Sequence, residues 1–164
     1  MWLPILLAAI VVSFGGVLLF GAPYLPTTKP QIAAALELAD LKPGQHLLEL
    51  GCGDGRVMLA AAKAGLQVTG YELNPLLAAL CWLRTRRYGK QVRVVWSDFW
   101  RAKWPPADAA FTFLLPKYMD KLDSKILAEG QPPKLVSFAF RLPNRPPKVE
   151  KAGVFLYHYP HGKA

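Results

Sequence analysis

The sequence has 164 residues, enough for one domain of ordinary size, and a net charge of +9 from 20 basic and 11 acidic residues. Its hydrophobic content of 52% and mean hydropathy of +0.18 are high for a soluble domain. The two cysteines, Cys52 and Cys81, form neither a disulfide framework nor a zinc-binding pattern, so we expect no metal site. All charged residues lie between positions 29 and 164, which separates the first 28 residues from the rest of the chain.

The chain begins with an uncharged run from Trp2 to Phe20 that is apolar except for Ser13. As a helix this run would extend roughly 28 Å, close to the ~30 Å hydrocarbon core of a bilayer. No basic residue precedes it and no clear cleavage site follows it, which favours an uncleaved transmembrane helix. We therefore assign residues 1–22 to a membrane anchor; a signal peptide and a helix docked on the domain are the alternatives. The basic residues follow the anchor, which predicts a single-pass protein with its main domain in the cytoplasm.

Residues 23–45 form a linker and a helix that precede the main domain. Pro23 and Pro26 favour an extended segment, because neither is compatible with a continuous helix. Residues 30–41 predict a helix, with Thr28 as its N-cap and Gln31 three positions later as the partner of a capping box. Residues 42–44, Lys-Pro-Gly, end this helix.

Residues 46–56 combine a short apolar strand with a glycine-rich turn, and a helical pattern follows from Val57 to Lys63. The glycines of the turn are Gly51, Gly53 and Gly55. A dinucleotide fingerprint would have its third glycine at the position of Arg56. Glu49 would repel a pyrophosphate but suits an ammonium group. The pattern therefore fits S-adenosyl-L-methionine, which has a cationic methionine end and no phosphate, and it resembles the E/D-x-G-x-G-x-G motif of class I methyltransferases.

The second predicted strand, residues 67–72, ends in an acid. Glu72 lies 21 residues after Gly51, close to the ~20-residue spacing at which a carboxylate accepts hydrogen bonds from ribose hydroxyls. The alternative is a surface glutamate at a strand end. Asn74 and Pro75 then begin a helix that we expect to reach about Tyr88, because asparagine is a good N-cap and proline suits the first turn. Asn74 is also a candidate contact of the cofactor.

The segment from Arg84 to Lys103 holds seven basic residues and a single acid, Asp98. Three tryptophans lie in or beside this segment, so a nucleic-acid surface is one interpretation. A face beside anionic lipid is the other. The predicted anchor favours lipid.

The rest of the chain predicts a parallel sheet with an unusual end. Strands are expected at residues 92–96, 108–115, 134–140 and 153–159, and a helix at residues 119–127. Ligands lie beyond the carboxyl ends of such strands, so residues 114–118 should border the methyl group. No helix is expected between the last two strands, which predicts a short, open C-terminal edge. The fold class is therefore α/β, a Rossmann-like class I methyltransferase sheet with helices on both faces, formed by residues 46–164 and preceded by a transmembrane helix.

Five stretches resemble one narrower family, the small membrane-anchored lysine methyltransferases related to the ATP synthase c-subunit lysine N-methyltransferase. They are residues 23–27, 48–56, 70–75, 113–116 and 136–143. The resemblance implies that the segment before the domain lies over the cofactor pocket, which makes Tyr24 and Thr27 candidate contacts. Class I methyltransferases often hold the adenine amino group at the position of Asp98, and Phe99 beside it is a candidate for stacking on the ring.

We therefore predict a membrane-anchored S-adenosylmethionine-dependent methyltransferase that methylates a lysine of a membrane protein. A methyltransferase acting on nucleic acid or on a small molecule, and a cofactor-binding domain without catalysis, are the alternatives. A lysine amine with a pKa near ~10.4 must lose a proton before it attacks, and Tyr118, Tyr24 and His158 are candidates for the base. The expected partners are the lipid bilayer and a protein substrate; nucleic acid is disfavoured.

Overall fold

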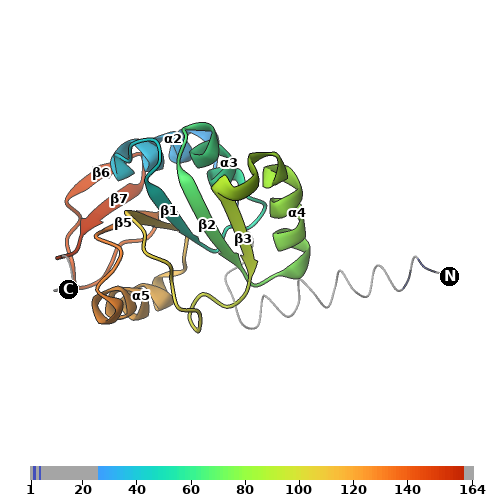
Figure 1. Cartoon of the computed structure of the whole chain (residues 1–164). Helices are drawn as coiled ribbons and strands as arrows, with labels where there is room; N and C mark the ends of the chain where they lie inside the picture. Colours follow the sequence, from blue (N-terminus) through green and yellow to red (C-terminus); the bar gives the residue numbers. More distant parts are fainter. Residues whose placement is uncertain (1, 3, 5–25, 161–164) are drawn as a thin grey trace.

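The computed structural model describes Trp2, Pro4 and residues 26–160 (Figure 1). Most of the predicted anchor, residues 1–22, lies outside the described residues, and so does Tyr24. Among the residues that are described, no helix is both long and apolar enough to cross a bilayer.

In the described part of the chain, seven strands form one sheet in the order β3-β2-β1-β4-β5-β7-β6. The strands are β1 (His46–Leu50), β2 (Gln67–Glu72), β3 (Val92–Trp96), β4 (Ala109–Thr112), β5 (Lys134–Phe138), β6 (Val149–Lys151) and β7 (Val154–His158). The first five strands run parallel, and β7 pairs antiparallel with both β5 and β6. The carboxyl ends of β1 to β5 therefore lie at one edge of the sheet.

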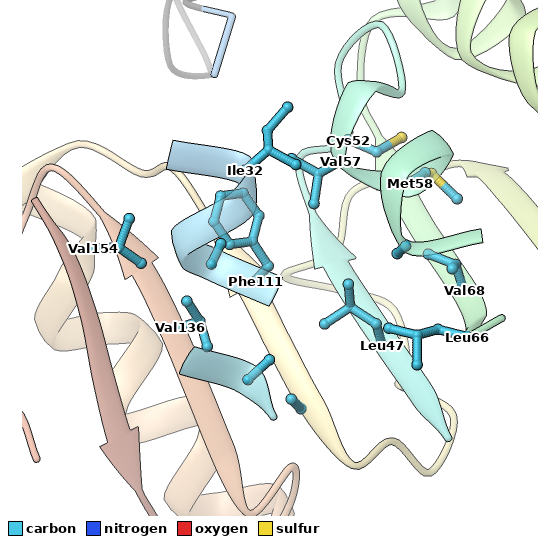
Figure 2. Close-up of a cluster of buried hydrophobic side chains, with 14 of the residues drawn as sticks. Ile32, Leu47, Cys52, Val57, Met58, Leu66, Val68, Phe111, Val136 and Val154 are labelled. Carbon is cyan, nitrogen blue, oxygen red and sulfur yellow. The ribbon is translucent and has the colours of Figure 1, made fainter. Parts of the chain in front are cut away.

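Helices cover both faces of this sheet, as predicted (Figure 1). The helices are α2 (Lys29–Ala39), α3 (Arg56–Lys63), α4 (Pro75–Thr85) and α5 (Pro116–Glu129), and a 3-10 segment η1 (Arg86–Gln91) follows α4. Leu47 and Val68 pack on the side of α2 and α3, where Figure 2 shows them near Met58. Leu48 packs with Leu122 of α5 on the other side. Both faces of β1 are buried, which explains its nearly continuous apolar run.

Several element ends differ from the sequence prediction. Helix α4 ends at Thr85 instead of Tyr88, and η1 follows it with a non-helical backbone at Gly89. Helix α5 begins at Pro116, three residues early, because proline is accepted in the first helical turn. Thr28 is the N-cap of α2, but its side chain makes no capping hydrogen bond, so the predicted capping box is wrong.

No helix lies between β5 and β6, as expected. Strand β6 itself was not predicted; it pairs with β7 and is the last strand in the order of the sheet, so the sheet ends there in a short edge strand. All three residues of β6 are exposed. So short a strand between prolines and a glycine shows no alternation of apolar and polar residues that could reveal it.

Gly70 in β2 lies directly against Met58 of α3. A Cβ atom at this position would overlap the Met58 sulfur and lie 2.8 Å from the Cys52 Cβ. We expect Gly70→Ala to lower the free energy of unfolding by about 1–3 kcal/mol, as overpacked cores do. Urea denaturation measures this loss. The loss should be smaller in a Met58→Ala background, and an equal loss in both backgrounds would contradict the steric explanation.

Candidate active site

The glycine turn joins the carboxyl end of β1 to α3. Gly51, Gly53 and Gly55 all have positive φ, at 89°, 52° and 81°, a region that other residues rarely adopt. The backbone N–H groups of Gly51 and Cys52 donate to the Tyr71 carbonyl at 3.0 and 2.8 Å, which fixes the turn to β2. A Cβ atom on Gly51 would meet no atom within 4 Å. At Gly51 the turn therefore presents bare backbone to open space, as close approach of a ligand requires, whereas a Cβ atom on Gly55 would lie 2.6 Å from the Cys81 sulfur.

Glu72, at the end of β2, connects that strand to the glycine turn. Its Oε2 accepts from the Gly53 N–H and its Oε1 from the Asn74 N–H, both at 2.8 Å. Burial raises the pKa of Glu72, and the Asn74 and Gly53 N–H groups oppose this shift. A carboxylate has about four acceptor sites, so each oxygen retains capacity for one more donor. This arrangement suits a pair of vicinal hydroxyls.

Glu49 is a buried acid of β1 with only 3% of its surface exposed. Its Oε2 has no hydrogen-bond partner among the described residues. Burial raises the pKa of Glu49 well above its usual range; Cys81 and Glu72 act in the same direction, and the Met58 N–H opposes them. A buried carboxyl oxygen without a partner is costly unless a donor reaches it. The chemistry of this acid therefore fits a cationic amino group, such as that of S-adenosylmethionine.

Asp54 within the turn forms contacts that the sequence analysis missed. Its carboxylate pairs with Arg56 at 2.9 Å and, at short range, with Arg84 of α4, which also donates to the Asp54 carbonyl at 3.1 Å. These contacts connect the glycine turn to α4. Arg84 is 30 residues away in the chain, and no local pattern links the two positions.

Asn74 is confirmed as the N-cap of α4. Its Oδ1 accepts from the N–H groups of Leu76 and Leu77 at 2.9 and 3.2 Å, and the residue is fully buried. The backbone N–H of Asn74 is the donor to Glu72 described above. Thr27 is buried just before α2. A contact of either side chain with the cofactor stays a prediction.

The segment after β3 brings aromatic side chains toward α5. Asp98 accepts from the Trp100 N–H at 2.9 Å, which stabilises a turn directly after the strand. The Phe99 and Trp100 rings lie 4.6 Å apart between centroids, and the Trp100 and Tyr118 rings lie 6.2 Å apart. Trp96 is 68% exposed, and its indole donates to the Leu73 carbonyl at 3.0 Å.

A second aromatic group lies where β4 and β5 end. The Phe113 ring lies 4.7 Å from that of Phe138 and 6.2 Å from that of Phe140. We call these three residues the phenylalanine cluster. Phe113 directly follows β4 and Phe138 ends β5, so the cluster belongs to the same edge as the glycine turn. Phe113 of the cluster directly precedes residues 114–118, whose position beside the methyl group stays a prediction.

His158 does not belong to this edge, so it is wrong as a candidate base. It pairs with Lys134, the first residue of β5, because β7 runs antiparallel. The histidine therefore lies at the amino ends of the parallel strands. A hollow of about 280 Å³, lined among others by His46, Thr69 and Arg93, also lies at that end. No cluster of three or more metal-ligating side chains occurs in the part of the chain that the structure describes.

Comparison with known proteins identifies the family. Residues 49–149 match the model of the ANTKMT methyltransferase domain. The chain belongs to this family. The family resemblance found in the sequence is therefore confirmed. The prediction of S-adenosyl-L-methionine as the cofactor is confirmed with it, because it is the cofactor of this family and fold.

Several curated relatives are lysine methyltransferases. The ATP synthase c-subunit lysine N-methyltransferase of Xenopus laevis is 34% identical over 74% of this chain and 55% of its own. The adenine nucleotide translocase lysine N-methyltransferase of Mus musculus is 35% identical over 76% of this chain and 56% of its own. The chain thus spans little more than half the length of these two relatives.

Among solved structures, an RNA methyltransferase from Salinibacter ruber in complex with S-adenosyl-L-homocysteine superposes with a TM-score of 0.76. It is 28% identical, and the match covers 85% of this chain and 97% of that one. The class I methyltransferase architecture predicted for the domain is therefore confirmed, whereas the roles of individual site residues stay predictions.

Proposed function

We propose that this chain is a membrane-anchored methyltransferase that transfers a methyl group from S-adenosylmethionine to a lysine of a membrane protein. The observation that carries the proposal is the pairing, at one edge of the sheet, of buried acids around a glycine turn with an apolar aromatic cluster. The acids fit the cofactor, and the cluster fits the aliphatic side chain of lysine. The names of the relatives support lysine as the acceptor.

The cofactor assignments follow from the donors and acceptors present. Glu72 accepts from the ribose hydroxyls, Glu49 pairs with the methionine ammonium, and Asp98 accepts from the adenine amino group. Phe99 provides an apolar surface for the adenine ring. When bound, S-adenosylmethionine supplies an electrophilic methyl group on a sulfonium.

The acceptor side must hold a lysine amine in line with that methyl group and remove its charge. An apolar surrounding favours the neutral amine, so the phenylalanine cluster would lower the pKa of an inserted lysine. Of the three residues named as candidate bases, Tyr24 lies outside the described residues and His158 lies at the wrong end of the strands. Tyr118, half-buried in the first turn of α5, is therefore the candidate to accept that proton. In-line positioning supplies most of the remaining acceleration.

The side chains after β4 distinguish this proposal from methylation of a nucleobase. Residues 113–116 are Phe-Leu-Leu-Pro and offer no polar side chain to receive an exocyclic amino group. The similarity to an RNA methyltransferase and the basic segment after α4 favour RNA as the second candidate acceptor.

The membrane part of the proposal rests on the apolar run from Trp2 to Phe20. Residues 21–29 would span at most roughly 30 Å even when fully extended. An anchored domain would therefore meet lysines close to the bilayer surface. The basic residues after the anchor favour a cytoplasmic domain.

The test incubates the purified full-length protein and labelled S-adenosylmethionine separately with detergent-solubilised membranes, soluble extract and RNA. We expect label on lysines of small membrane proteins, identified by mass spectrometry. Glu72→Ala is the control, because loss of the label in this variant shows that transfer depends on the proposed cofactor site. Label confined to soluble proteins or to RNA would reject the proposal, and cofactor binding without any transfer would favour a non-catalytic domain.

A further inference from the structure

Helix α4 carries an apolar stripe on its solvent side. Leu77, Ala78 and Cys81 point into the protein, whereas Leu76 and Leu83 are 44% and 50% exposed. Ala79 and Leu80 lie between those two leucines at helical spacing, so the four residues Leu76, Ala79, Leu80 and Leu83 share one face. We call this face the α4 stripe.

Exposed apolar groups are concentrated around this stripe. Eight large apolar side chains are strongly exposed among the described residues, and five of them lie on α4, two residues before its first residue, or on the adjacent edge strand β3. The five are Leu73, Leu76, Trp82, Leu83 and Trp96. Scattered apolar residues on a surface need no explanation, but a contiguous group marks an interaction site.

Unneutralised positive charge follows the stripe directly. Arg86, Arg87 and Lys90 lie in η1, the segment that directly follows α4. All three side chains are exposed, and no ion pair to any of them is found in the described part of the chain. No Asp or Glu occurs between Glu72 and Asp98. A partner that matches this surface is apolar and carries negative charge beside its apolar part.

We propose that the α4 stripe and the basic residues of η1 lie on an anionic lipid bilayer. Leucines and tryptophans beside arginines and lysines are the composition of helices that rest in the bilayer interface. Exposed leucines have no use against the phosphates of RNA, whereas an anionic membrane attracts basic residues and also takes up apolar side chains. This contact is separate from the proposed anchor, and its test needs no methyltransferase activity.

The lipid contact would orient the domain as well as retain it. Helix α4 begins at Pro75, shortly after Glu72, at the carboxyl ends of the parallel strands, where the candidate active site lies. An anchor alone leaves the domain free to rotate, whereas a second contact on the same bilayer restricts its orientation.

The experiment places a nitroxide label on the full-length protein in vesicles of phosphatidylcholine with or without phosphatidylglycerol. Leu83→Cys carries the label, and Leu127→Cys is the matched control, because Leu127 is also 50% exposed but lies on α5, across the sheet. The native cysteines, Cys52 and Cys81, are buried and should not react. Collisions with oxygen and with a water-soluble nickel complex are compared for each site.

In anionic vesicles we expect the ratio of oxygen to nickel collisions to rise at position 83 and to stay at its aqueous value at position 127. Neutral vesicles, or the triple substitution Arg86→Gln, Arg87→Gln and Lys90→Gln, should reduce the rise at position 83. The label at Leu76→Cys should repeat the result if Leu83→Cys folds poorly.

Equal collision ratios at positions 83 and 127 in anionic vesicles would overturn the proposal. A fall in nickel collisions at position 83 that occurs only when solubilised membrane proteins are added would also overturn the proposal, because the stripe would then bind a protein and not lipid.

Discussion

Replacing Glu72 with alanine should weaken binding of S-adenosylhomocysteine by about tenfold to somewhat more than a hundredfold. The loss of a charged hydrogen-bond acceptor corresponds to about 1.5–3 kcal/mol. Glu72 also accepts from the N–H groups of Gly53 and Asn74, so its removal releases the glycine turn from the end of β2. Isothermal titration calorimetry on the purified protein measures the affinity, and circular dichroism verifies the fold.

The matched control is Glu150→Ala, which removes an exposed acid of β6, the outermost strand on the opposite side of the sheet from β3. This variant should bind with unchanged affinity. Unchanged affinity of a folded Glu72→Ala variant would instead reject the ribose assignment. Tighter binding of NAD than of S-adenosylhomocysteine to the unmodified protein would reject the cofactor assignment altogether.

The glycine turn and its acids could be predicted because each depends on local signals. An apolar strand, alternating glycines and an acid about 20 residues later are visible within one short stretch. Strands β2 and β3 were predicted with the correct bounds. Asn74 was predicted as a cap because asparagine directly before proline is a local signal of a helix start, and its side chain does accept from the first turn of α4.

Features that depend on distant segments could not be predicted. Asp54 meets Arg84 only because α4 packs beside the glycine turn. The phenylalanine cluster joins residues from two connections, after β4 and after β5. His158 was a candidate base until the antiparallel direction of β7 placed it at the opposite end of the sheet, and strand direction has no local signature.

Cofactor affinity should rise with pH in the range above 4.5, the ordinary pKa of a glutamate, and Glu49 should be responsible. Burial raises the pKa of this carboxyl well above that value, so the group is protonated over a range in which an exposed glutamate is ionised. Only the ionised form attracts the ammonium group of S-adenosylhomocysteine. Titration calorimetry at several pH values measures the slope, and Glu49→Gln should flatten it.

The stability of the ligand-free protein should change with the opposite sign. A folded protein that binds the Glu49 proton more tightly than the unfolded chain does loses stability as pH rises above 4.5. Glu72 contributes in the same direction, because burial raises its pKa as well. Glu49→Gln should therefore stabilise the ligand-free protein toward urea at neutral pH while weakening cofactor binding. A variant that loses affinity and stability together would indicate that Glu49 holds the fold and does not pair with the cofactor.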